Sequence, residues 1–260
     1  MNRSFRDLVA DLPPLPGAVL AMPGDVAEIV IDAPATRNAL HPRMMVELAD
    51  AVEAVSDARV VLLYGARGTF CSGGDLGAVR AYLAEAGMGD ALARFMHATT
   101  ERLASLDAPV IGVVTGAALG GGAELLTACD LVYASPDAKI GWVQAQMGVL
   151  PGFGGGTRLV ERVGPARALQ LLADARVLSA ADAHAMGLVD VVTPAPLDHA
   201  RARARGWLAH APEVLRSVCR LTRTTAALPR DKALDAERAL FDRVWAGPAH
   251  RAALDRASRK

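Results

Sequence analysis

The sequence predicts an α/β fold, with a core of alternating strands and helices followed by a C-terminal helical region. Short apolar runs such as VVLLY at 60–64 and VIGVV at 110–114 are typical of buried parallel strands. Stretches with apolar residues at helical spacing separate these runs. Beyond residue 193 helix formers dominate, and prolines stand near the expected helix starts. We therefore expect a core over 1–193 and, over 194–260, helices that cover a pocket or pack against another subunit.

The core begins with strands. The turn formers Pro23-Gly24-Asp25 lie between the β-branched segments 18–22 and 26–32, which predicts a β-hairpin. Apolar residues at helical spacing predict a helix over 42–56 that leads into the buried strand at 60–64.

The same alternation then continues. A helix over about 90–106 precedes the strand at 110–114, and a short helix at 123–128 precedes a strand at 131–135. The three strands that alternate with helices should lie in one parallel sheet. A strand is expected at 187–192. Helices are expected at 157–163, 165–173, 179–185, 197–210, 213–226 and 231–245.

The composition excludes two classes of partner. Apolar residues make up 52% of the 260 residues, and 28 lysines and arginines balance 28 aspartates and glutamates. A chain without net charge has no long-range field that favours nucleic acid or an anionic membrane. We therefore expect a neutral partner that is recognised by its shape.

The sequence shows no signal for export or membrane insertion. No run approaches the roughly 18 apolar residues of a membrane span, and the polar start MNRSFRDL lacks the apolar segment of a signal peptide. Cys71, Cys129 and Cys219 are odd in number, and none stands in a zinc-binding or C-x-x-C spacing. We expect free thiols, no metal site and a cytoplasmic protein.

A first glycine turn lies in TFCSGGDL at 69–76, just before Asp75, the expected N-cap of a helix. Backbone N–H groups at a helix start have no intrahelical acceptor and lie at the positive end of the helix dipole. An anionic oxygen can bind there, and the Gly74 amide is the best-placed donor. Taken alone, the two glycines are better explained by a tight turn that needs glycine for positive φ and binds nothing.

A second turn, GAALGGGAELLTACD at 116–130, again runs from a strand into glycines and then a helix. Each glycine in a helix costs about 1 kcal/mol relative to alanine, so three in a row indicate close approach of a backbone or a ligand. Gly121 is the second candidate donor. Both turns stand at carboxyl ends of expected parallel strands, where α/β sheets bind ligands, and together they resemble a two-donor oxyanion hole.

Glu124 follows these glycines inside an otherwise apolar helix. A lone carboxylate in that setting is partly desolvated and its pKa is raised, so we expect Glu124 to be the principal catalytic side chain. The alternative is a charge that hydrogen-bonds a neighbouring loop and does no chemistry. Asp130, His97, Cys71 and Cys129 are expected to be structural.

Rival motifs are absent. The run PGFGGGT at 151–157 departs from G-x-G-x-x-G, and GAALGGG lacks the Lys-Ser/Thr of a phosphate loop. The elbow G-x-S-x-G fails at Phe70 around Ser72, and the six histidines show no H-E-x-x-H spacing. Neither a nucleotide cofactor, a serine triad nor zinc is indicated. Trp142 and Gln144, shortly before the glycine-rich run, are expected to line the pocket.

Four segments resemble the crotonase, or enoyl-CoA hydratase/isomerase, superfamily in their order and spacing. They are NAL at 38–40, TFCSGGDL at 69–76, GAALGGGAELLTACDLVYAS at 116–135 and VLPGFGGGTRL at 149–159. The likeness extends from about 17 to 193 and implies a crotonase-like spiral of ββα units. It also implies a homotrimer or a dimer of trimers.

The resemblance implies an acyl-CoA thioester as substrate, with no cofactor beyond the coenzyme A that the substrate carries. The amides of Gly74 and Gly121 would polarise the thioester carbonyl. The family's coenzyme A site falls on Arg37, Ala39, Ser72, Asp75 and Leu76. Residues 77–95 would form much of the acyl-pocket wall, and AEAGMGD at 84–90 is expected to be a mobile loop.

One departure from the family pattern bears on the reaction. Hydratases of the family carry two glutamates, of which one matches Glu124 and the other aligns with Gln144. An amide cannot exchange protons, and loss of one general acid or base typically costs about 10²–10⁴-fold in rate. Decarboxylation of an alkylmalonyl-CoA needs fewer proton-exchanging groups, because loss of CO₂ itself generates the enolate. The segments SGGDLGAVR, WVQAQMG and VWAGPA also resemble the ethylmalonyl-CoA decarboxylase branch.

The sequence therefore favours decarboxylation of ethylmalonyl-CoA or methylmalonyl-CoA, with Glu124 as proton donor and Gln144 holding the carboxylate or a water. Hydration or isomerisation of an enoyl-CoA is the enzymatic alternative. An acyl-CoA-binding subunit without activity is the non-enzymatic one. An acyl-transfer hydrolase would need Ser72 and His97 in contact.

Overall fold

The computed structural model describes residues 4–12, 15, 17–82 and 87–258. Within these residues the main sheet has the strand order β1-β2-β3-β4-β6-β9, and a smaller sheet has the order β5-β7-β8. The strands are β1 (Ala18–Met22), β2 (Val26–Asp32), β3 (Val60–Gly65), β4 (Val110–Val114), β5 (Ala117–Leu119), β6 (Leu131–Ala134), β7 (Lys139–Gly141), β8 (Leu178–Ser179) and β9 (Val191–Val192).

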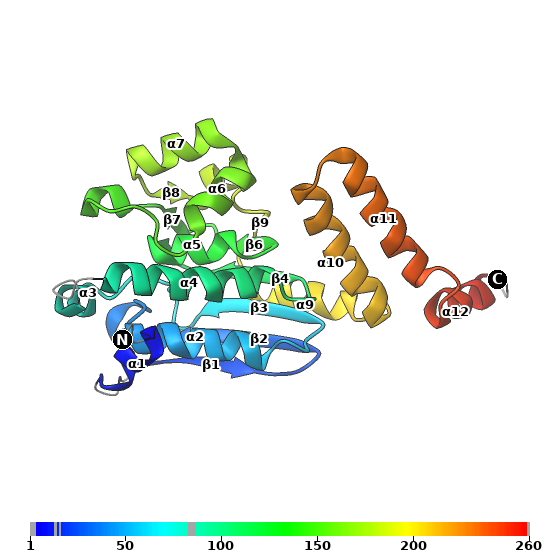
Figure 1. Ribbon diagram of the computed structural model, residues 1–260, viewed down its shortest axis with the longest axis horizontal. Helices are drawn as coiled ribbons and strands as arrows, with labels where there is room; N and C mark the ends of the chain where they lie inside the picture. The colour runs from blue at the N-terminus through cyan, green and yellow to red at the C-terminus, as the bar shows by residue number, and fades with distance from the viewer. Residues whose placement is uncertain (1–3, 13–14, 16, 83–86, 259–260) are drawn as a thin grey trace.

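Helices surround these sheets, which confirms the expected α/β class (Figure 1). They are α1 (Phe5–Ala10), α2 (Pro42–Ala54), α3 (Leu76–Tyr82), α4 (Met88–Ala104), α5 (Gly121–Thr127), α6 (Gly155–Val163), α7 (Pro165–Asp174), α8 (Ala180–Ala185), α9 (Pro196–Trp207), α10 (Pro212–Ala227), α11 (Arg230–Val244) and α12 (Pro248–Ala257). Two short 3₁₀ helices, η1 (Pro34–Thr36) and η2 (Gln144–Met147), complete the set. None of the described helices is both long and apolar enough to cross a membrane.

The strand pairing follows the expected topology. β1 and β2 form the antiparallel hairpin, with Ala18 opposite Asp32. β2, β3, β4 and β6 then pair in parallel, which places the three strands that alternate with helices side by side. The carboxyl ends of these strands meet at one edge of the sheet, where both glycine turns follow.

The main sheet is covered on both faces. Val61 and Leu63 of β3 belong to the core that includes α2 and α4, whereas their neighbours Val60 and Leu62 belong to the core beneath α9. All four are fully buried, which explains why β3 is apolar throughout instead of alternating. The first helix of the expected C-terminal region therefore packs as part of the core.

The later helices behave differently. α10 still contacts the core through the buried Leu215, and its Cys219 is buried as well. Figure 1 shows α11 and α12 extending away from the sheets, and none of the described residues of α11 or α12 is buried. Phe241 and Trp245 are 56% and 57% exposed. A cavity of about 560 Å³ lies among these three helices. In Figure 1 α11 and α12 lie far from α3 and α5, the helices that follow the two glycine turns, so a role in covering the pocket or in assembly remains a prediction.

Some elements differ from the sequence prediction. β5, β7 and β8 have two or three residues each, too few to show a periodic pattern. The strand expected at 187–192 shrinks to Val191–Val192, because the amides of Leu188 and Val189 bond to the carbonyl of Ala183 at the end of α8. α1 lies in a segment for which the sequence predicts no helix, whereas α12 lies in the expected helical region 194–260 without a range of its own there.

Two boundaries near the site also shift. The helix expected from residue 123 begins at Gly121, so two glycines stand in its first turn. In the segment expected to be a mobile loop, residues 84–86 lie outside the described part of the chain. Gly87 is the N-cap of α4.

Candidate active site

The first glycine turn is held by a parallel bridge between Leu40 and Gly74. The Leu40 amide donates to the carbonyl of Gly73 at 2.7 Å, and the Asp75 amide donates to the carbonyl of Leu40 at 3.1 Å. In such a bridge the N–H of the middle residue points away from the partner strand. The Gly74 amide is therefore directed out of the bridge. Asp75 is the expected N-cap of α3, since its Oδ1 accepts the amide of Ala78 at 3.0 Å.

A cavity of about 360 Å³ lies against this turn. It is lined by Thr36, Arg37, Ala39, Thr69, Ser72, Gly74, Asp75, Leu76, Gly77, Ala117 and Leu119. All five residues that the family resemblance assigned to the coenzyme A site are among them, together with Gly74. The structure thus gathers them around one cavity.

Asn38 is a further residue of this region that the sequence did not single out as functional. It is 1% exposed and has a φ of 59°. Its side chain accepts the amide of Ala33 at 2.7 Å and donates to the carbonyl of Thr69 at 2.6 Å. Asn38 thereby ties the segment that carries Arg37 and Ala39 to the approach of the glycine turn. A signal was present in the sequence, because asparagine tolerates positive φ better than most residues.

The second turn lies directly against the first. A Cβ atom on Gly73 would lie 3.7 Å from the Gly121 nitrogen, and one on Gly122 would lie 2.2 Å from the Cys71 carbonyl oxygen. The backbones approach so closely that a side chain at 122 has no room. Close backbone approach was the reason expected for the glycine run.

Both candidate donors are available. Gly121 is the first residue of α5, where the N–H has no intrahelical acceptor. Among the described residues, neither Gly74 nor Gly121 donates its amide hydrogen to a protein acceptor. Free amides at the starts of two helices, α3 and α5, can stabilise an oxygen that gains negative charge.

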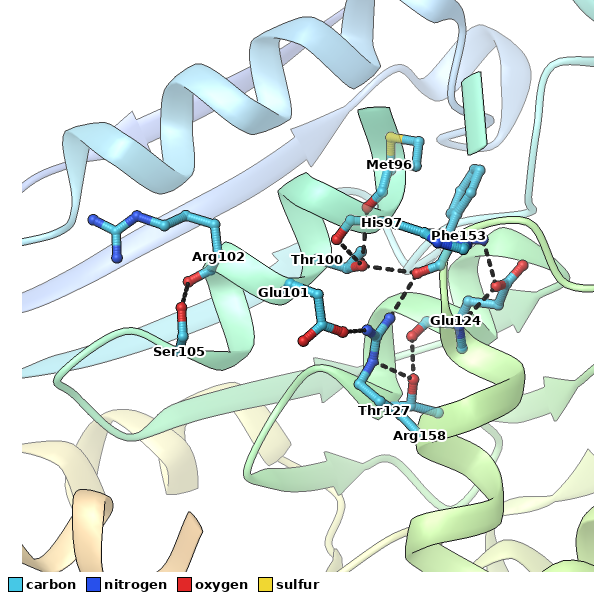
Figure 2. Close-up of polar contacts among 11 residues, drawn as sticks. Met96, His97, Thr100, Glu101, Arg102, Ser105, Glu124, Thr127, Phe153 and Arg158 are labelled. Carbon is cyan, nitrogen blue, oxygen red and sulfur yellow. Dashed lines mark hydrogen bonds and ion pairs between the residues drawn. The ribbon is translucent and has the colours of Figure 1, made fainter. Parts of the chain in front are cut away.

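The Glu124 carboxylate is buried on α5, with 2% of the residue exposed. Its Oε2 accepts the amide of Phe153 at 2.7 Å (Figure 2) and the amide of Gly155 at 3.0 Å. Its Oε1 accepts the amide of Gly152 at 3.1 Å and Nε2 of Gln144 at 2.9 Å. Burial raises the pKa of Glu124 above its ordinary value, and the four hydrogen bonds oppose that shift.

This environment has features of both interpretations of Glu124. The bonds to residues 152–155 are those of a carboxylate that anchors a loop. The desolvation is that of a carboxyl suited to proton transfer. Gly155 lets the loop come this close, since a Cβ atom there would lie 2.4 Å from the Cβ of Glu124.

Gln144 and Trp142 each leave one polar atom unused. Gln144 is 9% exposed, and its Oε1 has no hydrogen-bond partner among the described residues; the same holds for Nε1 of Trp142, which is 2% exposed. Buried polar atoms without partners are costly and rare in native proteins, so these two atoms need an explanation such as a role in the reaction. Neither residue lines the cavity beside Gly74. Gln144 instead contacts Glu124.

The remaining candidates have structural partners. Ser72 donates to the carbonyl of Thr36 at 3.1 Å, and within the described residues no hydrogen bond joins it to the exposed His97. Asp130 pairs with Arg223 at 2.6 Å.

The cysteines are free and buried. Burial raises the pKa of Cys71 and of Cys129 to about 12, so both are thiols at neutral pH. In the described part of the chain, no group of three or more His, Cys, Asp or Glu side chains could hold a metal ion.

Solved structures resemble this fold closely. An enoyl-CoA hydratase from Bacillus anthracis superposes with a TM-score of 0.87 at 27% identity, covering 93% of this chain and 96% of that one. An enoyl-CoA hydratase from Thermoplasma volcanium gives a TM-score of 0.85 at 26% identity, with 92% and 96% covered.

Sequence relatives carry a different name. Ethylmalonyl-CoA decarboxylase of Danio rerio is 38% identical over 258 residues, which cover 91% of this chain and 85% of that protein. Ethylmalonyl-CoA decarboxylase of Homo sapiens is 35% identical over 234 residues, with 87% and 76% covered. The sequence model of the enoyl-CoA hydratase/isomerase family matches residues 22–255. The two glycine turns, the fold and these matches agree, and the chain belongs to the enoyl-CoA hydratase/isomerase family, the crotonase superfamily.

Proposed function

We propose that this protein is an acyl-CoA lyase that decarboxylates a short alkylmalonyl-CoA, such as ethylmalonyl-CoA or methylmalonyl-CoA. The observation that carries the proposal is the pair formed by Glu124 and Gln144, in which only the glutamate can exchange a proton. The relatives named ethylmalonyl-CoA decarboxylase support the same reaction.

The reaction needs few groups. The bond between the α-carbon and the carboxylate breaks, CO₂ leaves, and the electron pair passes into the thioester, whose oxygen becomes an enolate oxyanion. The amides of Gly74 and Gly121 donate to that oxygen, and stabilising it lowers the barrier because the charge develops only as CO₂ departs. Protonation of the α-carbon gives the acyl-CoA product.

Glu124 supplies this proton, and solvent replaces it after each turnover. Its burial favours the protonated form before the reaction, and its four hydrogen-bond donors stabilise the carboxylate that remains afterwards. A proton on Oε1 would displace the Nε2 group of Gln144. Rotation of the Gln144 amide would then bring Oε1 of Gln144 toward Glu124. This oxygen has no partner among the described residues and would accept the hydrogen bond from the Glu124 hydroxyl.

The displaced amide group would in turn be free to donate to the substrate carboxylate. The coenzyme A portion occupies the cavity lined by Arg37, Ala39, Ser72, Asp75 and Leu76, next to the Gly74 amide. The reaction as written needs no cofactor besides the coenzyme A of the substrate, and activity should survive dialysis against EDTA.

Hydration or isomerisation of an enoyl-CoA is the second candidate, favoured by the solved structures titled enoyl-CoA hydratase. Hydration needs a base for the water and an acid for the α-carbon. In this site Gln144 stands where the second proton-exchanging group of a hydratase is expected. Isomerisation could use Glu124 alone to move one proton.

A substrate panel tests the proposal. The purified chain is incubated with ethylmalonyl-CoA, methylmalonyl-CoA and crotonyl-CoA, while CO₂ release, water addition and double-bond migration are followed. CO₂ release from a malonyl thioester is the expected result. Rapid hydration of crotonyl-CoA without CO₂ release would overturn the proposal, and tight binding without any turnover would identify an acyl-CoA-binding subunit instead.

Assembly and location complete the proposal. A homotrimer or a dimer of trimers would cover the exposed Phe241 of α11 and Trp245 at its C-cap, and the helices after 207 would provide the contact. A cytoplasmic location agrees with three free, buried cysteines. Cell fractionation tests the location.

A further inference from the structure

Arg158 is a buried cation outside the cavity and outside the oxyanion turns. It belongs to α6 and is 8% exposed. Its Nη2 donates to the carbonyl of Phe153 at 2.7 Å, its Nε donates to the hydroxyl of Thr127 at 3.2 Å, and its Nη1 pairs with Glu101. A buried guanidinium that donates to a carbonyl, a hydroxyl and a carboxylate at once fixes the relative positions of those groups.

Thr100 reaches the same carbonyl from α4. Its hydroxyl lies 2.7 Å from the Phe153 oxygen, closer than the carbonyls of its own helix at Met96 (2.9 Å) and His97 (3.2 Å). Figure 2 shows Thr100 and Arg158 converging on the Phe153 carbonyl from two helices. Thr100 is fully buried, so this bond is shielded from competing water.

The other groups of Phe153 face the reaction site. Its amide makes the shortest of the four hydrogen bonds to Glu124, at 2.7 Å. Its ring packs on the oxyanion turn, since a Cβ atom on Gly121 would lie 2.5 Å from that ring. One residue therefore contacts both the carboxylate and the start of α5, while its carbonyl is held from behind.

Arg158 also fixes α5 itself. The hydroxyl of Thr127, which accepts from Arg158, donates to the backbone carbonyl of Glu124 at 2.6 Å. Arg158 thus holds the helix that carries the carboxylate and the loop that binds it. Thr100 holds only the loop.

We propose that Thr100 and Arg158 are positioning residues, which by holding the Phe153 carbonyl keep the Phe153 amide on the Glu124 carboxylate and the Phe153 ring on Gly121. This inference rests on the proposed role of Glu124 as proton donor. It predicts that loosening the Phe153 carbonyl weakens one hydrogen bond to the anion and thereby raises the pKa of Glu124 further.

No other charge on the neighbouring helices intervenes in this network among the described residues. The titratable groups on α4 and α6 are Asp90, Arg94, His97, Glu101, Arg102, Arg158, Glu161 and Arg162. Asp90 pairs with Arg94, and Arg102 pairs with Glu53. His97 and Glu161 are exposed, and Arg162 pairs with Asp190 at 2.8 Å. Glu101 pairs with Arg158 on the solvent side.

The test compares Thr100→Val with Thr99→Val. Valine keeps the shape of threonine and carries a methyl group in place of the hydroxyl. Thr99 is the matched control for Thr100. Thr99 is also buried on α4, but its hydroxyl donates only within its own helix, to the carbonyl of Phe95 at 2.9 Å. Thr100→Ser restores the hydroxyl. Arg158→Lys keeps the charge but cannot bind Phe153, Thr127 and Glu101 together.

A proton donor works only while protonated, so the rate falls as pH rises through its pKa, and a raised pKa moves this fall to higher pH. For Thr100→Val we expect the alkaline limb of kcat to move up by about half a unit to one unit, with KM unchanged. Arg158→Lys should move it in the same direction. Thr100→Ser and Thr99→Val should keep the wild-type profile.

A ¹³C NMR titration of the Glu124 carboxyl, assigned by the loss of its signal in Glu124→Gln, measures the same shift without turnover. If the wild-type chain releases no CO₂, the proposed function fails, while the titration still decides this inference. Equal Glu124 pKa values in Thr100→Val and Thr99→Val, or a lowered value in Thr100→Val, would overturn it.

Discussion

At the scale of single residues, the site is defined by one carboxyl that can exchange a proton and one amide that cannot. Glu124 and Gln144 contact each other at 2.9 Å, although 20 residues separate them in the chain. The pair limits the chemistry more than the oxyanion turns do, because any enolate of a thioester would gain from two free amides.

Glu124→Gln tests the proton donor. We expect kcat for decarboxylation to fall about 10²-fold or more, since a positioned general acid is lost, while KM changes little because the coenzyme A cavity lies elsewhere. Thermal denaturation monitors the fold. The wild-type rate should fall as pH rises through the raised pKa of Glu124, and that alkaline limb should vanish in the variant. A kcat within a few-fold of wild type would remove Glu124 from the mechanism.

Gln144→Glu tests the missing second carboxylate. The variant regains two proton-exchanging groups, so we expect crotonyl-CoA hydration to rise by at least tenfold. The rate of decarboxylation should fall, because a negative charge at position 144 would repel the substrate carboxylate. Both rates are measured on the same preparations. Unchanged rates for both reactions would mean that position 144 does not select the reaction.

At the scale of elements, the site depends on how closely α5 approaches the first glycine turn. The carbonyl oxygen of Cys71 occupies the place where a Cβ atom of residue 122 would stand. The two turns can therefore lie this close together only if residue 122 is glycine.

Gly122→Ala should separate the turns. A Cβ atom 2.2 Å from the Cys71 oxygen forces α5 to shift, which we expect to cost about 1–3 kcal/mol of unfolding free energy and most of the activity. Gly206→Ala in α9 is the control, since it meets no atom within 4 Å and should be neutral or slightly stabilising. Urea denaturation compares the three proteins. A fully stable, active Gly122→Ala would contradict the close approach.

A second contact between elements joins α9 to the sheet. Arg201 binds the Glu28 carboxylate through two bonds of 2.7 Å, and the Tyr64 hydroxyl donates to the same group at 2.6 Å. Hydrogen bonding to Arg201 lowers the pKa of Glu28, whereas burial raises that of Tyr64 to about 12.

Glu28→Gln should therefore destabilise the protein in a pH-dependent way. A carboxyl with a lowered folded pKa stabilises the fold fully above its ordinary pKa of 4.5, and this stabilisation is lost as pH falls through the folded pKa. We expect the variant's Tm to be a few degrees lower at pH 7, with the difference shrinking below pH 4. An equal difference at both pH values would point to packing instead of charge.

At the scale of the whole molecule, a single chain leaves its last helices with little to cover them. Phe241 of α11 and Trp245 at its C-cap are both more than half exposed, and their ring centroids lie 5.0 Å apart. Exposed apolar surface of this kind marks an interaction site.

We expect sedimentation velocity to show a trimer or hexamer at micromolar concentration. A Phe241→Ser/Trp245→Ser double variant should shift the distribution toward smaller species, because it removes two aromatic contacts from the proposed interface. Circular dichroism checks that its helices remain. A wild-type chain that sediments as a monomer would contradict the proposed assembly.

The sequence by itself determined the fold class, the order of the main strands and the two glycine turns. These depend on local patterns: apolar runs reveal buried strands, and glycine runs reveal close backbone approach whatever the partner. The resemblance to a family added the pairing of position 124 with position 144. Arg37 and Leu76 could be assigned to one site only through that resemblance, because the local sequence around each residue does not show that the two lie close together in the fold.

Only the tertiary structure decided how the site is held together. The β5-β7-β8 sheet is too short to leave a sequence pattern. The Phe153 carbonyl collects donors from Thr100, 53 residues earlier, and from Arg158, five residues later. A buried threonine and an arginine in an amphipathic helix look ordinary in sequence, and their role arises from long-range packing that local patterns do not encode.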